Sequence, residues 1–177
     1  MGTQQLILLV INIVGGIAVI GSYFLGLNAQ AGGSGALWGG VPESIRPVYT
    51  VSMLLAALAY FAFIYFILFR LVPAETSIGG RFGYSLFYAI FLMILIPSAL
   101  WMPLTNVYVG NSSQVIWFAV RTVLVLVALG SVALVWALLS LQARVPGVPY
   151  WLAVAGSAYF AFHTALLDAI IWPALFK

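Results

Sequence analysis

The chain has 177 residues, of which 65% are hydrophobic and only 5% are charged, and its formal net charge is +3. A soluble domain carries about 25% charged residues, so this chain cannot cover a water-facing surface, and six basic side chains are too few for a nucleic-acid interface. The absence of cysteine excludes disulfides, thiolate metal sites and dithiol redox chemistry, and one histidine is too few for the usual transition-metal site. The composition predicts an integral membrane protein, and no metal site and no certain cofactor are predicted.

Five apolar runs are each long enough to cross a bilayer, which takes ~20 residues of helix. In chain order they are Gln5–Leu27, Val48–Leu71, Phe82–Leu104, Gln114–Leu141 and Pro149–Phe176. Residues typical of turns fill the breaks between the runs, and nothing is left over for a soluble domain. The sequence therefore predicts one all-α domain over residues 1–177, a five-transmembrane-helix bundle.

The first run could be mistaken for a signal peptide, because Ala29-Gln30-Ala31 resembles a cleavage site. No Lys or Arg precedes the run, and its apolar core is longer than the usual ~7–15 residues. We expect a retained first span.

Basic residues in short loops predict the orientation of the chain in the membrane. Arg70, Arg81 and Arg144 share one side with the N-terminus. Arg46 and Lys177 lie on the other side, that of the first loop, together with Arg121 just inside the fourth run. This bias favours a cytoplasmic N-terminus and a C-terminus outside.

The third run ends in the segment "IPSALWMPLTN", which holds Pro97, Trp101 and Pro103. A proline in a membrane helix frees backbone carbonyls, which is tolerated where neighbours or a cavity satisfy them. We therefore expect an opened helix end with an aromatic wall on the first-loop side. Thr105 and Asn106 would offer hydrogen bonds at its mouth.

Polar groups inside a bilayer are costly and are candidates for function. Asn12, Arg121, His163 and Asp168 lie within the runs. Arg121 and Asp168 occur at similar depth in consecutive antiparallel helices, which predicts a buried ion pair between them. Such a pair would either lock two helices together or line a polar pocket.

His163 lies near the middle of the fifth run, five residues before Asp168. Five residues are roughly 140° apart around an α-helix of about 3.6 residues per turn, so the two side chains are expected on different faces. Three roles stay open for His163: an interhelical hydrogen bond, ligation of a tetrapyrrole metal, or a hydrogen bond to a bound ligand.

Small residues recur every four positions along the fifth run, at Ala153, Ser157, Ala161, Ala165 and Ala169. Small side chains at this spacing let helices approach closely, either within the chain or in a homodimer. Trp151 and Trp172, near the two ends of the run, fit the interfacial positions that tryptophan favours.

Flexible, aromatic and polar elements converge on the first-loop side. The first loop, "AGGSGALWGGVPESIRP", is rich in glycine and carries Trp38, and Trp117 begins the fourth run nearby. Ligand pockets are mostly apolar with a few placed polar groups. We predict a cavity for a flat or elongated apolar molecule, with the first loop as its lid.

The segment Leu100-Trp101-Met102-Pro103, together with Pro47 and Tyr49 at the start of the second run, resembles the TspO/translocator (tryptophan-rich sensory) protein family. That family has five spans and a Trp-x-Pro motif late in the third. The resemblance covers nearly the whole chain and implies binding of porphyrins, sterols or similar apolar ligands, often by a homodimer.

The favoured function is an integral membrane protein that binds, senses or transports an apolar ligand such as a porphyrin or sterol. The predicted partners are the lipid bilayer, this ligand and a second copy of the chain, without nucleic acid. The alternatives are an accessory subunit of a larger membrane complex and a small transporter whose polar path uses Arg121, Asp168 and His163. An enzyme is not predicted, because no nucleophile–base pair, metal cluster or phosphate loop is evident. The predicted ligand-binding residues are Trp38, Trp101, Pro103, Asn106, Trp117, Arg121, His163 and Asp168.

Overall fold

The computed structural model describes residues 1–28, 33–142 and 146–176 of the chain. Within these residues it contains five helices that are long and apolar enough to cross a membrane. They are α1 (Thr3–Asn28), α2 (Arg46–Phe69), α3 (Leu86–Gly110), α4 (Gln114–Leu139) and a last span over Val148–Leu175. The predicted all-α, five-helix bundle is confirmed, and the chain is a multi-pass integral membrane protein.

The last span consists of three helical pieces that follow one another without a break. An α-helix, α5 (Val148–Ala161), leads into a π-helical segment (Phe162–Ile171) and then into the short α6 (Trp172–Leu175). The π-helical segment, called the π segment below, carries His163 and Asp168.

Helix α3 corrects one expectation from the sequence. It remains α-helical through Pro97 and Pro103 and ends at Gly110, six residues beyond the predicted end at Leu104. The helix end does not open, because an unwound segment in lipid must find new partners for all its backbone groups. Each proline that stays in the helix removes one N–H and frees only the carbonyl four residues earlier.

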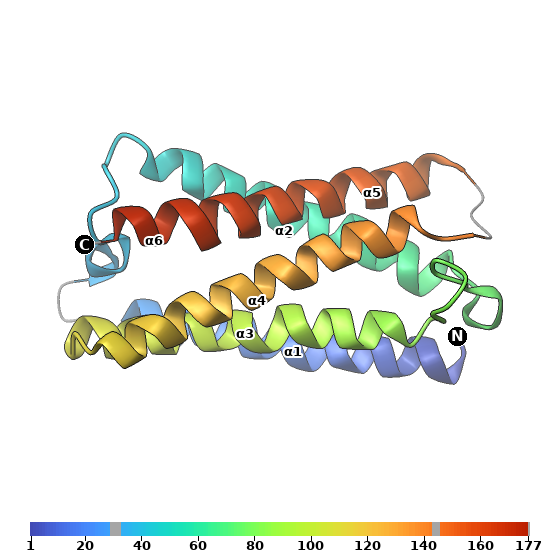
Figure 1. Cartoon of the computed structure of the whole chain (residues 1–177), viewed down its shortest axis with the longest axis horizontal. Helices are drawn as coiled ribbons and strands as arrows, with labels where there is room; N and C mark the ends of the chain where they lie inside the picture. The colour runs from blue at the N-terminus through green and yellow to red at the C-terminus, as the bar shows by residue number, and fades with distance from the viewer. Residues whose placement is uncertain (29–32, 143–145, 177) are drawn as a thin grey trace.

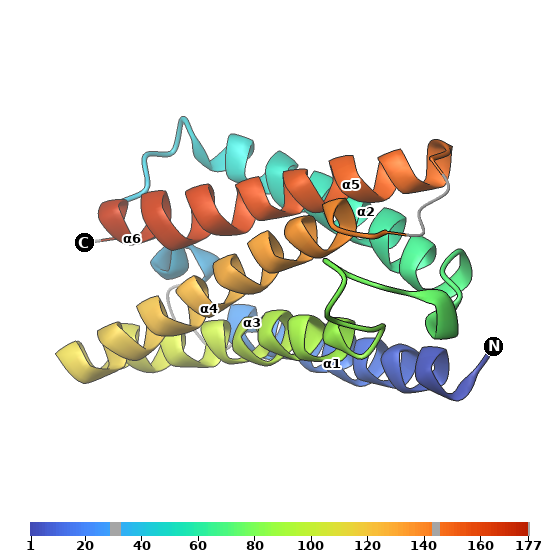
Figure 2. The ribbon, with the colours of Figure 1, turned by 45° about the vertical axis from the view of Figure 1, so that its right-hand side comes forward.

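The helices run roughly antiparallel, so the N-terminus lies at one end of the bundle and the C-terminus at the other (Figure 1). Helix α3 packs between α1 and α4, while α2 packs along α5, and both views show these two groups (Figures 1 and 2). Helices α1 and α2 touch each other very little. The hydrogen bond from the Tyr60 hydroxyl to the Asn12 side chain is one of the few links between them.

Small residues bring α5 against its neighbours within the chain, which is one of the two roles that the sequence left open. Ala153, Ser157 and Ala161 are buried inside the chain. A Cβ added to Gly156 would lie 2.9 Å from the backbone oxygen of Ala59 in α2, so the two helices are in near-backbone contact. The small-residue seam therefore serves packing within the chain, and a homodimer stays a prediction.

The first-loop end of the bundle is closed by a cluster of buried apolar side chains. Its members are Val41, Tyr49, Val120, Leu124, Leu167, Trp172 and Phe176. Trp172 is only 4% exposed, and its indole N–H donates to the Leu37 carbonyl at 3.3 Å. The predicted interfacial role of Trp172 is wrong, because the first loop folds over this side chain. Trp151 is 58% exposed, and its interfacial position stays a prediction.

Several sequence predictions fall outside the described residues. Arg144 and Lys177, used for the orientation, lie there, as does the Ala29-Gln30-Ala31 segment. The cytoplasmic N-terminus and the retained first span stay predictions.

Candidate functional site

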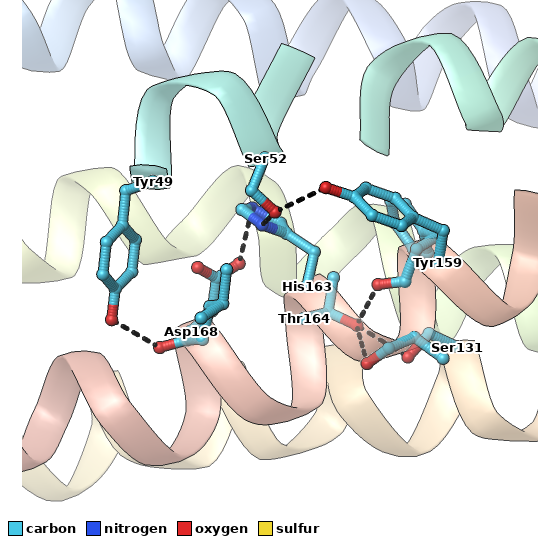
Figure 3. A network of polar contacts seen from close by, with 10 residues as sticks. Tyr49, Ser52, Ser131, Tyr159, His163, Thr164 and Asp168 are labelled. Carbon is cyan, nitrogen blue, oxygen red and sulfur yellow. Dashed lines mark hydrogen bonds and ion pairs between the residues drawn. The ribbon is translucent and has the colours of Figure 1, made fainter. Parts of the chain in front are cut away.

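The π segment brings together two polar residues that α-helical geometry would place on different faces. In a π-helix each N–H bonds to the carbonyl five residues back, so positions five apart lie above one another. His163 and Asp168 have this spacing, and His163 Nε2 lies 3.5 Å from Asp168 Oδ2 (Figure 3). The expectation that they point to different faces is wrong, because it assumed α-helical geometry.

A hydrogen-bonded chain continues from His163 into α2 and back to α5. Ser52 Oγ lies 2.9 Å from His163 Nδ1, and the Tyr159 hydroxyl donates to Ser52 Oγ at 3.0 Å (Figure 3). One neutral imidazole fits this arrangement, with Ser52 donating to Nδ1 and the Nε2 proton facing Asp168. The interhelical role of His163 is confirmed. Nδ1 is engaged by Ser52, and ligation of a tetrapyrrole metal by Nε2 stays a prediction.

The predicted ion pair between Arg121 and Asp168 is wrong. Arg121 is exposed on α4. Among the basic side chains of the described residues, only His163 lies beside the Asp168 carboxylate. Apolar runs give the depth of a residue but not its direction around the helix. The buried face of α4 includes Val120 and Leu124, which turns Arg121 outward.

The Asp168 carboxylate has few partners for an acidic group inside a membrane bundle. Its 3.5 Å contact with His163 exceeds the roughly 2.7–3.2 Å of a good hydrogen bond. The nearby Tyr49 hydroxyl donates instead to the Leu167 carbonyl, at 3.2 Å (Figure 3). The described residues give neither carboxylate oxygen a hydrogen bond, and the side chain is 33% exposed. Asp168 is therefore available to another group.

Two cavities adjoin Asp168 and share the lining residues Tyr23, Met53, Trp101, His163 and Asp168. The larger, of about 230 Å³, lies between all five spans. The smaller, of about 130 Å³, lies towards the first loop. Asp168 and His163 thus form a polar wall common to both spaces.

The first loop closes the smaller cavity. Leu37 and Trp38 of this loop line it together with Tyr49 and Trp172. The position of the predicted cavity, at the first-loop side, agrees with this geometry.

Trp101 is the second unsatisfied polar group of the site. Its indole nitrogen is buried, and no hydrogen-bond partner for it occurs among the described residues. Buried polar atoms are nearly always paired, and the indole N–H can only donate. A hydrogen-bond acceptor in either cavity would give the Trp101 N–H its missing partner.

The eight predicted site residues divide into two equal groups. Trp38, Trp101, His163 and Asp168 line one or both cavities. The other four, Pro103, Asn106, Trp117 and Arg121, line neither.

Two of the four non-lining residues have packing roles instead. The Asn106 amide donates to the Gly26 carbonyl of α1 at 3.2 Å. The Trp117 ring stacks on Phe176, with centroids 5.5 Å apart. Pro103 and Arg121 are exposed.

Sequence reasoning missed the residues that hold and surround the polar pair. Ser52 and Tyr159 support His163, while Tyr23 and Met53 line both cavities. A serine inside the mainly apolar α2 was a usable signal, as was Tyr159 one helical turn before His163. Nothing in the sequence distinguishes Tyr23 or Met53 from lipid-facing residues.

Comparisons of the chain with protein-family models, curated proteins and solved structures found no match.

Proposed function

We propose that this membrane protein binds an apolar small molecule in the two cavities around Trp101 and Asp168, and thereby senses or transports it. The buried, unpartnered N–H of Trp101 is the observation that carries the proposal. Leaving such a donor without a partner costs stability. The structure retains it beside two mainly apolar spaces, where a ligand oxygen or nitrogen would accept its hydrogen bond.

The size of the cavities limits the ligand. Their volumes, about 230 and 130 Å³, lie below the roughly 300–1,000 Å³ of most ligand pockets. Because they share five lining residues, an elongated molecule such as a sterol could extend from one into the other. A porphyrin is broader and would need the surrounding helices to move apart. These dimensions favour a narrow apolar ligand.

We also propose distant membership of the TspO/translocator protein family. The Leu100-Trp101-Met102-Pro103 segment supports it, because Trp101 of this segment lines both cavities. The five-span fold and the first loop over the smaller cavity are in keeping with a binding protein of this kind.

An enzyme is less well supported, although Ser52, His163 and Asp168 are the residue types of a hydrolase triad. A nucleophile must reach the bound substrate. Ser52 is 5% exposed and lines neither cavity, and its hydroxyl is held between Tyr159 and His163. Of the three, His163 and Asp168 reach the cavities without the nucleophile, which suits recognition of a ligand.

The test is a titration of the protein in nanodiscs of zwitterionic lipid with a sterol and with protoporphyrin IX. Tryptophan fluorescence and thermal stability would both be followed. We expect saturable binding that weakens roughly tenfold in Trp101→Phe, about the effect of one lost hydrogen bond. Trp151→Phe is the control, because Trp151 is exposed and outside both cavities. Absence of saturable binding by these ligands and by other apolar probes would contradict the proposal.

A further inference from the structure

We propose that the ligand is an apolar amine, whose protonated or quaternary nitrogen lies beside Asp168 among aromatic rings. This inference rests on the proposed function, since it concerns the same two cavities. The inference adds the charge of the ligand that these cavities bind, which is positive.

The distribution of acidic residues is the first argument. The chain has three, and Asp168 is the one inside a span, because Glu43 and Glu75 precede and follow α2. An acidic group in a bilayer is costly unless it is paired or serves a function. Since its contact with His163 is long, the Asp168 carboxylate has no close positive partner among the described residues and has room for one.

Among the described residues, basic side chains do not supply that counter-charge. No Lys or Arg of residues 1–28, 33–142 and 146–176 lines either cavity. Arg46, at the start of α2, lies 3.7 Å from Glu43 and donates to the Val41 carbonyl at 3.1 Å. Arg121 is exposed on α4. A cationic ligand would neutralise the ionised form of Asp168, which a neutral ligand could not do.

The aromatic rings are the second argument, and it is independent of charge. The Tyr23 and Trp101 centroids are 5.5 Å apart at an interplanar angle of 47°, and those of Trp101 and Trp172 are 5.5 Å apart at 78°. Tyr23 and Trp101 line both cavities and Trp172 lines the smaller one, so three differently oriented rings adjoin the space beside Asp168. Ring faces attract cations, and cages of such rings recognise quaternary ammonium groups.

One contact between a cation and a ring already occurs at this end of the bundle. The Arg46 guanidinium carbon lies 5.9 Å from the centroid of the Trp38 ring, within the range of a cation–π contact. Trp38 in turn packs edge-on against Tyr49, with centroids 5.9 Å apart. Both rings line the smaller cavity.

Other ligand charges fit less well. The carboxylates of a porphyrin would add negative charge beside Asp168. A hydroxyl could donate to Asp168 and accept from Trp101, but it would leave the carboxylate charge uncompensated in an apolar space. The acceptor that Trp101 needs can be a second polar atom of the amine.

The experiment compares three probes in nanodiscs of zwitterionic lipid, with empty nanodiscs as the blank. The first is phenethyltrimethylammonium, and the second is the hydrocarbon in which carbon replaces its nitrogen. The third is an alcohol of the same length. We expect the cation to bind roughly tenfold or more tightly than the hydrocarbon, in line with a desolvated cation–π contact beside a carboxylate.

Variants assign this difference to the site. Asp168→Asn should remove most of the preference for the cation, whereas Glu43→Gln, at an exposed acid outside both cavities, should keep it. If Asp168→Asn does not fold, Trp38→Leu provides the second test, because it removes a cage ring and leaves the carboxylate in place. It should weaken cation binding several-fold and hydrocarbon binding less.

The outcomes separate this inference from the proposed function. Equal binding of all three probes, or tightest binding of the alcohol, would overturn the charge class and leave an apolar binding site. If none of the three probes binds, and neither the sterol nor the porphyrin binds, both proposals are contradicted. A preference for the cation that persists in both Asp168→Asn and Trp38→Leu would place the cation elsewhere and overturn the inference.

Discussion

His163 and Asp168 face each other across one turn of the same helix, with Nε2 and Oδ2 3.5 Å apart, although five positions separate them in the chain. The π segment makes this possible, and it extends over ten residues, from Phe162 to Ile171. π-helical turns are rare and are frequent at functional sites. An α-helical segment would turn one of the two polar groups away from the other. The local geometry thus keeps both at the wall of the cavities.

The hydrogen-bonded chain behind His163 should contribute to stability. Ser52→Ala would leave His163 Nδ1 and the Tyr159 hydroxyl without their shared partner. Buried groups that lose a partner cost about 1–3 kcal/mol. We expect a loss of that order in the free energy of unfolding, measured by titrating the protein from mild detergent into a denaturing one.

Ser22→Ala is the matched control for this prediction. The Ser22 hydroxyl donates to the Val19 carbonyl of its own helix, so its removal strands no second side chain. A change within about 0.5 kcal/mol is expected there. Equal effects of the two substitutions would show that the chain through Ser52 adds nothing to stability.

The spans could be predicted because hydrophobicity and length are properties of the sequence itself. Four of the five predicted spans match the helices to within two residues at each end, whereas α3 is shifted by four residues at its start and six at its end. The shift arises because Pro103 stays within the helix and because residues 78–85 form turns before it.

The partners within the site could be predicted only in part. The position of Arg121 and of Asp168 within their apolar runs placed both at one end of the bundle. The direction in which each side chain points around its helix axis depends on packing, which the runs do not give. The π segment shifts the direction of Asp168 further, and no residue in it signals a change from α-helical geometry. Trp101 was recognisable because two prolines flank it.

Helix contact between α2 and α5 depends on a missing side chain. Gly156→Ala would place a Cβ 2.9 Å from the Ala59 backbone oxygen, which cannot rotate away. Overpacking of this kind costs about 1–3 kcal/mol. We expect a corresponding fall in the free energy of unfolding by the same detergent titration.

Gly21→Ala tests whether this effect is specific. An added Cβ at Gly21 in α1 meets nothing within 4 Å. Alanine is a better helix former than glycine by up to about 1 kcal/mol. The protein should therefore keep or gain stability, and a loss as large as that of Gly156→Ala would rule out the contact as the cause.

Arg121 should be dispensable for the binding site. It is exposed and is separated from Asp168 in the structure, so Arg121→Gln should leave ligand affinity unchanged and alter stability by no more than about 0.5 kcal/mol. A loss of several kcal/mol, as expected when one partner of a buried ion pair is removed, would restore the pairing with Asp168.

The indole N–H of Trp101 should report directly on ligand binding. The chain has six tryptophans, so a nitrogen–proton correlation spectrum of the labelled protein should show six indole signals, assignable by single Trp→Phe variants. The Trp101 N–H lacks a partner among the described residues, whereas that of Trp172 already donates to the Leu37 carbonyl. A hydrogen bond to a ligand would move the Trp101 proton downfield, with the largest shift of the six. Trp151, which is exposed and lines neither cavity, should not respond.

If a saturating ligand moved the Trp151 signal and left that of Trp101 in place, the bound molecule would lie outside these cavities, and the unpartnered indole would need another explanation.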